Sequence, residues 1–348
     1  MASDALSEIK SKSYTIAWID TFDISRLASL LAKRYGLRVL PWNRFLEADF
    51  LFCDTFDYKY EKYDGVRILI TAENHPADLN VFDYCLTHEK KEDDRRLYFP
   101  YFRYRLYEDG GKSIASLLER PALGAEELAA QNRRFCAFVC RNGACKRRNR
   151  FVRHLIERNL VDCGGPFMNN IGHCVEDKVE FQRGYLFSVA YENESAPGYL
   201  TEKIMDAFLA RSIPIYWGDP CVAEIFNPEA FVNAADFRSE TELVEYLVRL
   251  SQDPERLLRM LNAPVFRNPR IAEEALQGVY AFFDRIFERG PGATRRTRWQ
   301  RIKAVLQNYY GHGFFRTLRR ISRRIRGKKV GRESALPNGA MPSKWEKK

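Results

Sequence analysis

Five polar or charged residues that could hold a ligand gather in one loop of the chain. The loop follows an apolar run at residues 187–191, which is typical of a strand. Apolar residues then recur at helical spacing from Ile204, and residues 213–217 form a second apolar run. In such a βαβ unit, ligands bind outside the carboxyl ends of the strands, where a helix N-terminus directs backbone N–H groups at an anion. The residues of this loop are Glu192, Asn193, Tyr199, Glu202 and Lys203.

Lys203 falls in the first turn of the expected helix, with Thr201 in position to cap it. A lysine is unfavourable there, because the positive end of the helix dipole repels it. An anion held between Lys203 and the helix end would remove this conflict. The position therefore predicts a bound anion, supplied by a ligand, at the start of the helix.

The stretch resembles the donor-binding motif of the α-1,3-fucosyltransferases of glycosyltransferase family 10, in the bacterial form. The resemblance runs from about residue 13 to residue 285, and it includes neither terminus and no heptad repeats. The matching donor residues are Phe187, Tyr191-Glu192-Asn193, Tyr199, Thr201-Glu202-Lys203 and the run from Ile213 to Gly218. The other matching segments are Ala72-Glu73-Asn74, Asn80 to Tyr84, Arg96 to Pro100, Arg148-Asn149 with Phe151, Phe226-Asn227-Pro228 and Phe231-Val232-Asn233.

This resemblance implies an inverting transfer of L-fucose from GDP-β-L-fucose to the 3-hydroxyl of N-acetylglucosamine in a lactosamine-type glycan. It implies an α/β fold of GT-B type, in which two Rossmann-like domains face each other across a cleft. We expect an acceptor-side domain at residues 1–128, a GDP-fucose-binding domain at 129–290, a basic amphipathic helical tail at 291–330 and a disordered end at 331–348.

The alternation of strand and helix patterns independently favours parallel α/β sheets. The patterns also indicate a helix and linker at 110–131, and a last helix that packs back across the domain junction. The expected strands are 14–20, 37–40, 50–53, 66–71, 81–87 and 135–140, and the expected helices are 25–35, 146–159, 242–250 and 273–288.

Fucosyl transfer requires that negative charge on the leaving GDP be stabilised and that the attacking hydroxyl lose a proton. Lys203 and Arg148 are the candidates for the first task, because preorganised cations can stabilise developing charge. Glu73 is the candidate general base, because it should lie at the carboxyl end of a strand, facing the cleft. Glu73 could instead form a loop turn, and Arg148 could belong to a solvated basic face.

The remaining loop residues are expected to contact the sugar nucleotide or to support the loop. Glu202 would suit the ribose hydroxyls, since a carboxylate accepts two hydrogen bonds from a diol. Asn193 and Tyr199 would line the nucleotide or the fucose, although Tyr199 could be core packing and Glu192 could be structural.

No cofactor is expected, since GDP-fucose is a substrate. The chain has no Asp-x-Asp pair, which many metal-dependent sugar-nucleotide transferases use, so we expect a divalent metal to be unnecessary. Cys136, Cys140 and Cys145 with His154 have loose spacing for zinc, and no metal site is predicted. Eight irregularly spaced cysteines favour free thiols.

The net charge of +10 comes from the end of the chain. Residues 291–348 carry 17 Lys and Arg against 2 Asp and Glu, which leaves 39 basic and 44 acidic residues in 1–290. Apolar residues at helical spacing between arginines predict a basic amphipathic helix pair at an anionic membrane surface. Nucleic-acid binding and packing on the protein are the alternatives, and nucleic acid is the least favoured.

The first residues carry no apolar signal segment, and no apolar run reaches the ~20 residues of a spanning helix. We therefore expect a cytoplasmic protein, peripheral on the inner face of the membrane. The acceptor is expected to be a glycan, with a lipid-linked one among the alternatives. Two other functions stay open: a GT-B transferase for another GDP-sugar, and a catalytically inactive membrane-associated binding protein.

Overall fold

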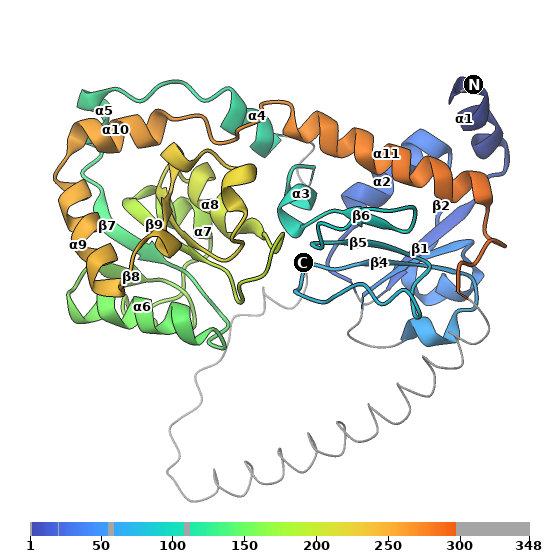
Figure 1. Ribbon diagram of the computed structural model, residues 1–348, viewed down its shortest axis with the longest axis horizontal. Coiled ribbons are helices and arrows are strands. Elements are labelled where there is room, and N and C mark those ends of the chain that lie inside the picture. Colours follow the sequence, from blue (N-terminus) through green and yellow to red (C-terminus); the bar gives the residue numbers. More distant parts are fainter. Residues whose placement is uncertain (1, 20, 55–58, 108–111, 297–348) are drawn as a thin grey trace, which may run out of the picture.

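The computed structural model describes residues 2–19, 21–54, 59–107 and 112–296. It contains two parallel sheets, each in its own α/β unit, and the two units lie side by side (Figure 1). The first sheet has the order β2 (Arg38–Val39), β1 (Thr15–Ile19), β3 (Phe50–Cys53), β4 (Val66–Ile70), β5 (Tyr84–Thr87) and β6 (Arg96–Tyr98). The second has the order β11 (Val232–Asn233), β10 (Ile213–Trp217), β9 (Tyr185–Tyr191), β7 (Arg134–Phe138) and β8 (Val161–Cys163).

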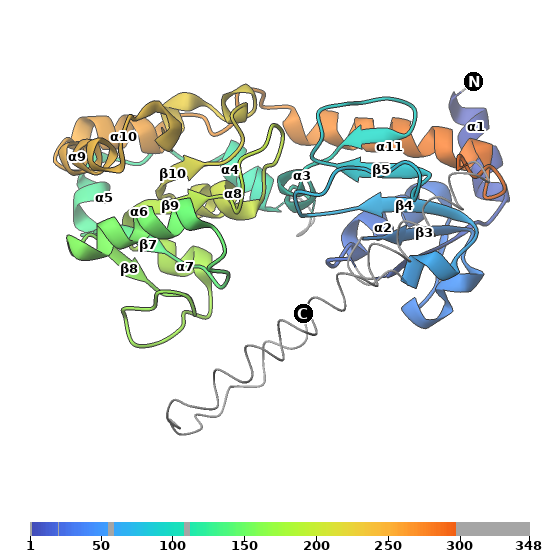
Figure 2. The same cartoon turned by 60° about the horizontal axis from the view of Figure 1, so that its bottom comes forward.

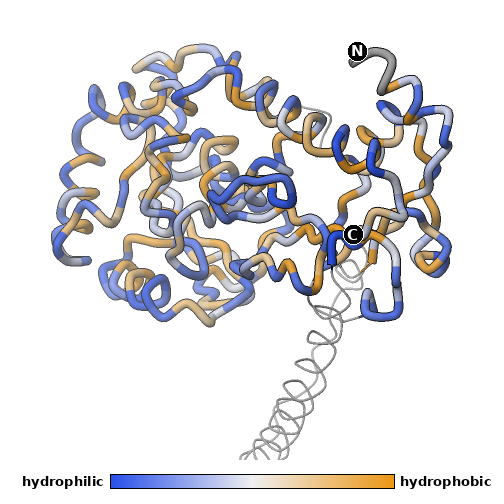
Figure 3. Tube along the Cα trace, turned by 45° about the vertical axis from the view of Figure 1, so that its right-hand side comes forward, coloured by the Kyte–Doolittle hydropathy of each residue, from blue (hydrophilic) through white to orange (hydrophobic). Residues whose placement is uncertain are grey.

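Helices cover the sheets, so the central strands are buried on both faces and read as continuous apolar runs. β3 and β4 are buried along their whole lengths. Hydrophilic and hydrophobic residues alternate along the chain in the helices of both units (Figure 3). The helices are α1 (Ala2–Ser11), α2 (Ser25–Tyr35), α3 (Tyr101–Arg105), α4 (Lys112–Leu118), α5 (Ala125–Ala130), α6 (Lys146–Glu157), α7 (Lys178–Arg183), α8 (Glu202–Leu209), α9 (Glu240–Ser251), α10 (Pro254–Asn262) and α11 (Ile271–Arg289).

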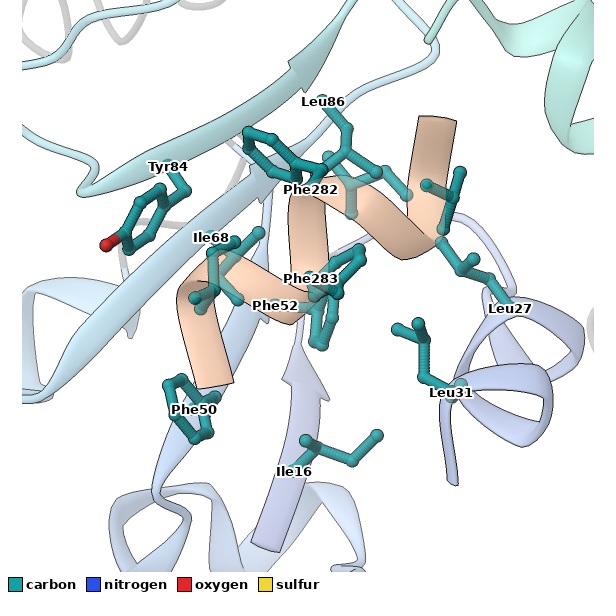
Figure 4. Packing of buried hydrophobic residues seen from close by; sticks show 14 of the residues in the cluster. Ile16, Leu27, Leu31, Phe50, Phe52, Ile68, Tyr84, Leu86, Phe282 and Phe283 are labelled. Atoms are coloured by element: carbon teal, nitrogen blue, oxygen red, sulfur yellow. The ribbon is translucent and has the colours of Figure 1, made fainter. Parts of the chain in front are cut away.

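Helix α11 crosses from the second unit back onto the first sheet, which confirms the expected return across the junction (Figures 1 and 2). Its Phe282 and Phe283 point into the core formed with Phe52 and Ile68 (Figure 4). The range 129–290 therefore includes a helix whose apolar face belongs to the first unit. The division at residue 128 stays a prediction.

A third apolar cluster joins the two units. Phe102 of α3 and Leu117 of α4 pack in it with Met205 and Phe208 of α8. The backbone N–H of Phe102 also donates to the carbonyl of Leu200, at 3.2 Å. These contacts fix α8 to the segment that connects the sheets. They also hold the loop of residues 192–201 (the donor loop), which leads into α8 and matches the donor-binding motif.

Most expected elements are confirmed, with three kinds of difference. The strand expected at 81–87 begins only at Tyr84, because the N–H groups of Val81 and Phe82 bond to the carbonyl of Asp78 in a turn. The helix and linker expected at 110–131 contain two short helices, α4 and α5. The helices α1, α3, α7 and α10 and the short strands β6, β8 and β11 were not among the expected elements.

The start of the expected tail packs on the first unit. Arg296 is 3% exposed, and its Nε donates to the fully buried Asp83 at 2.9 Å. The first residues of the tail predicted for 291–330 therefore contact the first unit. The boundary at residue 291 stays a prediction, and residues 297–330 and the end predicted for 331–348 lie outside the described residues. Within the described part, no helix is long and apolar enough to span a bilayer.

Candidate active site

The predicted site residues lie at the carboxyl ends of β4 and β9 and at the first turns of α6 and α8. Loops from both sheets meet there. Nδ2 of Asn74, after β4, donates to Oε2 of Glu194, after β9, at 2.7 Å. Nζ of Lys90, after β5, lies 2.5 Å from Oε2 of Glu224, which follows β10. The carboxyl edges of the two sheets therefore face each other.

Glu192 is the anionic group at the start of α8. Its side chain is fully buried and accepts three hydrogen bonds. The donors are the Thr201 N–H at 2.8 Å, the Thr201 hydroxyl at 2.6 Å and Nζ of Lys203 at 2.9 Å. Thr201 occupies the N-cap position, but its side chain bonds to Glu192 and makes no capping bond to the helix. The anion that offsets Lys203 is therefore part of the protein.

Lys203 has an 18% exposed side chain and two close acidic neighbours, Glu192 at 2.9 Å and Glu202 at 3.7 Å. Burial lowers the pKa of Lys203, but the charges of these two carboxylates outweigh it, so that its pKa lies above the usual value. Lys203 is therefore a cation throughout the physiological range. Its ammonium has three N–H donors, and Glu192 and Thr201 take two of them. One donor is left for a ligand.

Arg148 lies in the first turn of α6 and is only 2% exposed, so the interpretation as a solvated basic face is wrong. Its NH1 donates to Oδ1 of Asn193 at 2.9 Å and to the carbonyl of Tyr191 at 3.3 Å. Its NH2 donates to the carbonyl of Asn142 at 2.5 Å, and its Nε is buried without a partner. Arg148 thus joins the loop after β7 to the donor loop. Because the amide oxygen of Asn193 is taken, its NH₂ group is left to donate.

Glu202 is held as a carboxylate. Burial raises its pKa, but the charges of Lys203 and Lys178, followed by the hydrogen bond from its own N–H, lower it to about 2. The side chain is 30% exposed. It can therefore accept hydrogen bonds from a ligand at neutral pH.

Tyr199 packs at the junction between the units. It is 2% exposed, and its ring meets that of His88 edge-on at 5.6 Å. Burial raises the pKa of Tyr199, and the charges of Glu192 and Glu73 raise it further against the opposing effect of Lys203. This packing is the alternative that the sequence left open, and ligand contact by Tyr199 stays a prediction.

Glu73 is half-buried in the loop directly after β4, as its position in the sequence indicates. Its N–H donates to Oγ1 of Thr71 at 3.2 Å, and its carbonyl accepts from the N–H of His75 at 2.8 Å. No hydrogen bond to its carboxylate is recorded among the described residues. The backbone thus forms a turn, and the carboxylate is near enough to Tyr199 to affect its pKa.

Sequence reasoning missed several residues that shape the site. The guanidinium of Arg147 lies 5.0 Å from the ring centroid of Trp217, at the end of β10, which adds a third cation beside Arg148 and Lys203. Asn142 and Glu194 hold the loops that carry the predicted residues. The sequence could have indicated Asn142 and Glu194 as site residues, because they lie in loops after β7 and β9, where parallel sheets place functional side chains.

Two parallel α/β units whose carboxyl edges face each other are the arrangement of the GT-B glycosyltransferases. The model of the glycosyltransferase family 10 (fucosyltransferase) C-terminal region matches residues 128–262, and that of the alpha-(1,3)-fucosyltransferase FucT N-terminal domain matches residues 15–107. The chain belongs to glycosyltransferase family 10.

The chain is 33% identical to the alpha-(1,3)-fucosyltransferase FucT of Helicobacter pylori over 279 residues, which are 72% of this chain and 57% of that protein. It therefore spans little more than half of that relative. A crystal structure of an alpha1,3-fucosyltransferase with GDP superposes with a TM-score of 0.61 at 26% identity, covering 79% of this chain and 90% of that chain. One with GDP-fucose superposes with the same TM-score at 24% identity, covering 77% and 90%, and supports the fold alone.

Proposed function

We propose that the chain is an inverting α-1,3-fucosyltransferase that moves L-fucose from GDP-β-L-fucose to the 3-hydroxyl of N-acetylglucosamine in a lactosamine-type glycan. The observation that carries the proposal is the cluster at the start of α8, where Glu192 orders Lys203 beside Glu202, and Arg148 orders Asn193. The relative from Helicobacter pylori and the solved structure with GDP supply the donor class.

In this proposal, Lys203 directs its third N–H at the diphosphate of GDP. Arg148 is covered in this structure, so it acts through its charge and through Asn193, whose NH₂ group donates to the donor sugar nucleotide. Fixed cations cost little reorganisation when negative charge grows on the leaving group. Glu202 accepts hydrogen bonds from the ribose diol, and Glu192 supports the site without touching the ligand.

The chemical step is a direct displacement. The acceptor oxygen forms a bond to the anomeric carbon while the bond from that carbon to the GDP oxygen breaks. Glu73 takes the hydroxyl proton, and GDP leaves with the bonding electron pair. Attack opposite the leaving group inverts the anomeric configuration, with no covalent sugar–enzyme intermediate.

The test is transfer from GDP-fucose to N-acetyllactosamine without added metal, with Glu73→Gln and Lys203→Ala beside the wild type and Glu229→Gln as an exposed control. We expect the control to match the wild type. A carboxylate base contributes typically 10²–10⁴-fold, so Glu73→Gln should lose about that much in kcat. An active Glu73→Gln variant would overturn the base assignment. A wild type that neither binds nor turns over GDP-fucose would overturn the donor.

We further propose that residues after Arg296 bring the enzyme to an anionic membrane surface, on the inner face, where a lipid-linked glycan could be the acceptor. The proposal rests on the basic amphipathic sequence of that segment. Removal of residues 297–348 should release the protein from anionic liposomes and leave transfer to a soluble acceptor intact. Unchanged liposome binding would contradict it.

A further inference from the structure

A cavity of about 390 Å³ lies at the amino-terminal edge of the second sheet, away from the donor loop. Arg183, one of its lining residues, comes just before β9, and Arg211 comes just before β10. Helix α4, which lies beside α8 in Figure 2, and the residues after it form the opposite wall. Lys203 lies in the first turn of α8 and the lining residue Phe208 in its last turn, so about 8 Å of helix, at 1.5 Å per residue, separates the cavity from Lys203.

Positive charge in this cavity is poorly compensated. Arg120 donates to the carbonyl of Ala263 at 2.5 Å, and the guanidinium of Arg211 donates to the carbonyl of Pro121. Within the described ranges, neither arginine has a carboxylate in salt-bridge range. Nε of Arg211 is buried without a hydrogen-bond partner. The carboxylates nearby are exposed Glu119, on the rim, and Glu180, 3.0 Å from Arg183.

These arginines are not needed to cap the C-terminus of α8. Backbone N–H groups already bond to the last carbonyls, from Ala210 to Asp206, from Arg211 to Phe208 and from Ser212 to Ala207. Burial, together with the charge of Arg211, lowers the pKa of Arg120 to about 10. A half-buried cation with this environment gains stability from an anion, since opposite charge offsets both effects.

We propose that this cavity, the arginine pocket of Arg120, Arg183 and Arg211, binds a small phosphate-bearing anion. Guanidinium groups match phosphate oxygens with paired hydrogen bonds, which a lysine cannot do. The volume is in the range of pockets for small organic ligands, so it has room for a group attached to the phosphate. The apolar side chains of Leu117 and Phe208 line the rest of the cavity and can contact such a group. The phosphate could come from a soluble metabolite or from a lipid headgroup.

The test is isothermal titration of the full chain with pyrophosphate, inorganic phosphate and a short-chain, water-soluble phosphatidic acid, at constant ionic strength and with saturating GDP present. The double variant Arg120→Gln/Arg211→Gln removes the two unpaired guanidiniums. Arg183→Gln is a milder variant, because that side chain is 52% exposed and pairs only with exposed Glu180. The control Arg158→Gln/Arg256→Gln removes the same charge from exposed positions.

We expect one phosphate-binding site that GDP does not displace. Affinity should fall at least tenfold in the double variant and severalfold in Arg183→Gln, and it should not change in the control. Binding of the phosphatidic acid alone would identify a lipid headgroup as the source, whereas binding of pyrophosphate or phosphate would identify a soluble one. Equal affinity in wild type, Arg183→Gln and the double variant would overturn the proposal, as would the absence of binding by all three probes.

Discussion

Removal of Arg296 should destabilise the first unit, although the residue lies near the start of the segment for which the sequence predicts a basic helical tail. Asp83 is fully buried and Arg296 nearly so, with side chains 0% and 1% exposed. The Asp83 carboxylate accepts hydrogen bonds from the N–H groups of Arg67, Arg295 and Arg296 and from Nε of Arg296. In Arg296→Met, a buried carboxylate loses its cation.

Breaking one side of a buried ion pair costs about 3–5 kcal/mol, because the remaining charge has lost its counter-charge and no water replaces it. Each 1.4 kcal/mol is a factor of ten, so amide hydrogen exchange in β4 and β5 should become roughly 10²- to 4 × 10³-fold faster where it requires opening of the sheet. The double variant Asp83→Leu/Arg296→Met removes both charges and should recover much of the loss.

Two truncations make the same comparison. A chain ending at Arg296 keeps the pair, and a chain ending at Gly290 loses it together with the bond from Arg295 to Asp94. We expect the first to match the full chain in exchange of β4 and β5. The second should exchange at least as fast as Arg296→Met, because Asp83 also loses the backbone N–H groups of Arg295 and Arg296. Equal protection in both truncations, or a change below about 1 kcal/mol in Arg296→Met, would refute the reasoning.

Three further predictions concern the donor loop. Gly198→Ala should lower the melting temperature, because φ is +82° at this position and a Cβ would lie 2.1 Å from the carbonyl oxygen of His88. An unchanged melting curve would contradict this close packing. Glu192→Gln should weaken GDP binding at least tenfold in a titration, because Lys203 loses the carboxylate that orders it; unchanged affinity would show that the lysine is ordered otherwise. Glu202 has a lowered pKa of about 2, so its stabilisation is present above the unfolded value and is lost as pH falls through 2. The difference in unfolding free energy between wild type and Glu202→Gln should therefore be constant from pH 8 to about 5 and shrink below that.

The fold was predictable because its strands and long helices carry strong periodic signals. β3 and β4 are continuous apolar runs, which indicate strands that are buried on both faces of a parallel sheet. α11 has an amphipathic pattern, which indicates a helix that packs on the face of such a sheet. The short strands β8 and β11 could not be predicted, since two or three residues carry no period. They are strands because a neighbouring strand offers backbone partners, which is a tertiary effect.

The site was predictable in position but not in its internal contacts. The carboxyl ends of strands place Glu73 and the donor loop by topology alone. The burial of Arg148 was hidden by the cations around it, although its spacing from Phe151, Val152 and Leu155 puts it on the apolar face of α6. That spacing is the signal that could have separated it from its exposed neighbours.

The unfavourable position of Lys203 shows why a local conflict in sequence does not by itself identify a ligand. The anion beside Lys203 in the structure is not a ligand but Glu192, which lies only 11 positions earlier in the chain and bonds to Lys203. Because this carboxylate also holds the Thr201 N–H and hydroxyl, the helix start is ordered before any ligand arrives. A site built in this way presents a fixed cation to an incoming diphosphate. Its energetic advantage should then appear as charge develops on the leaving group, which requires that Glu192 keep its hydrogen bonds to Lys203 and Thr201 through the reaction.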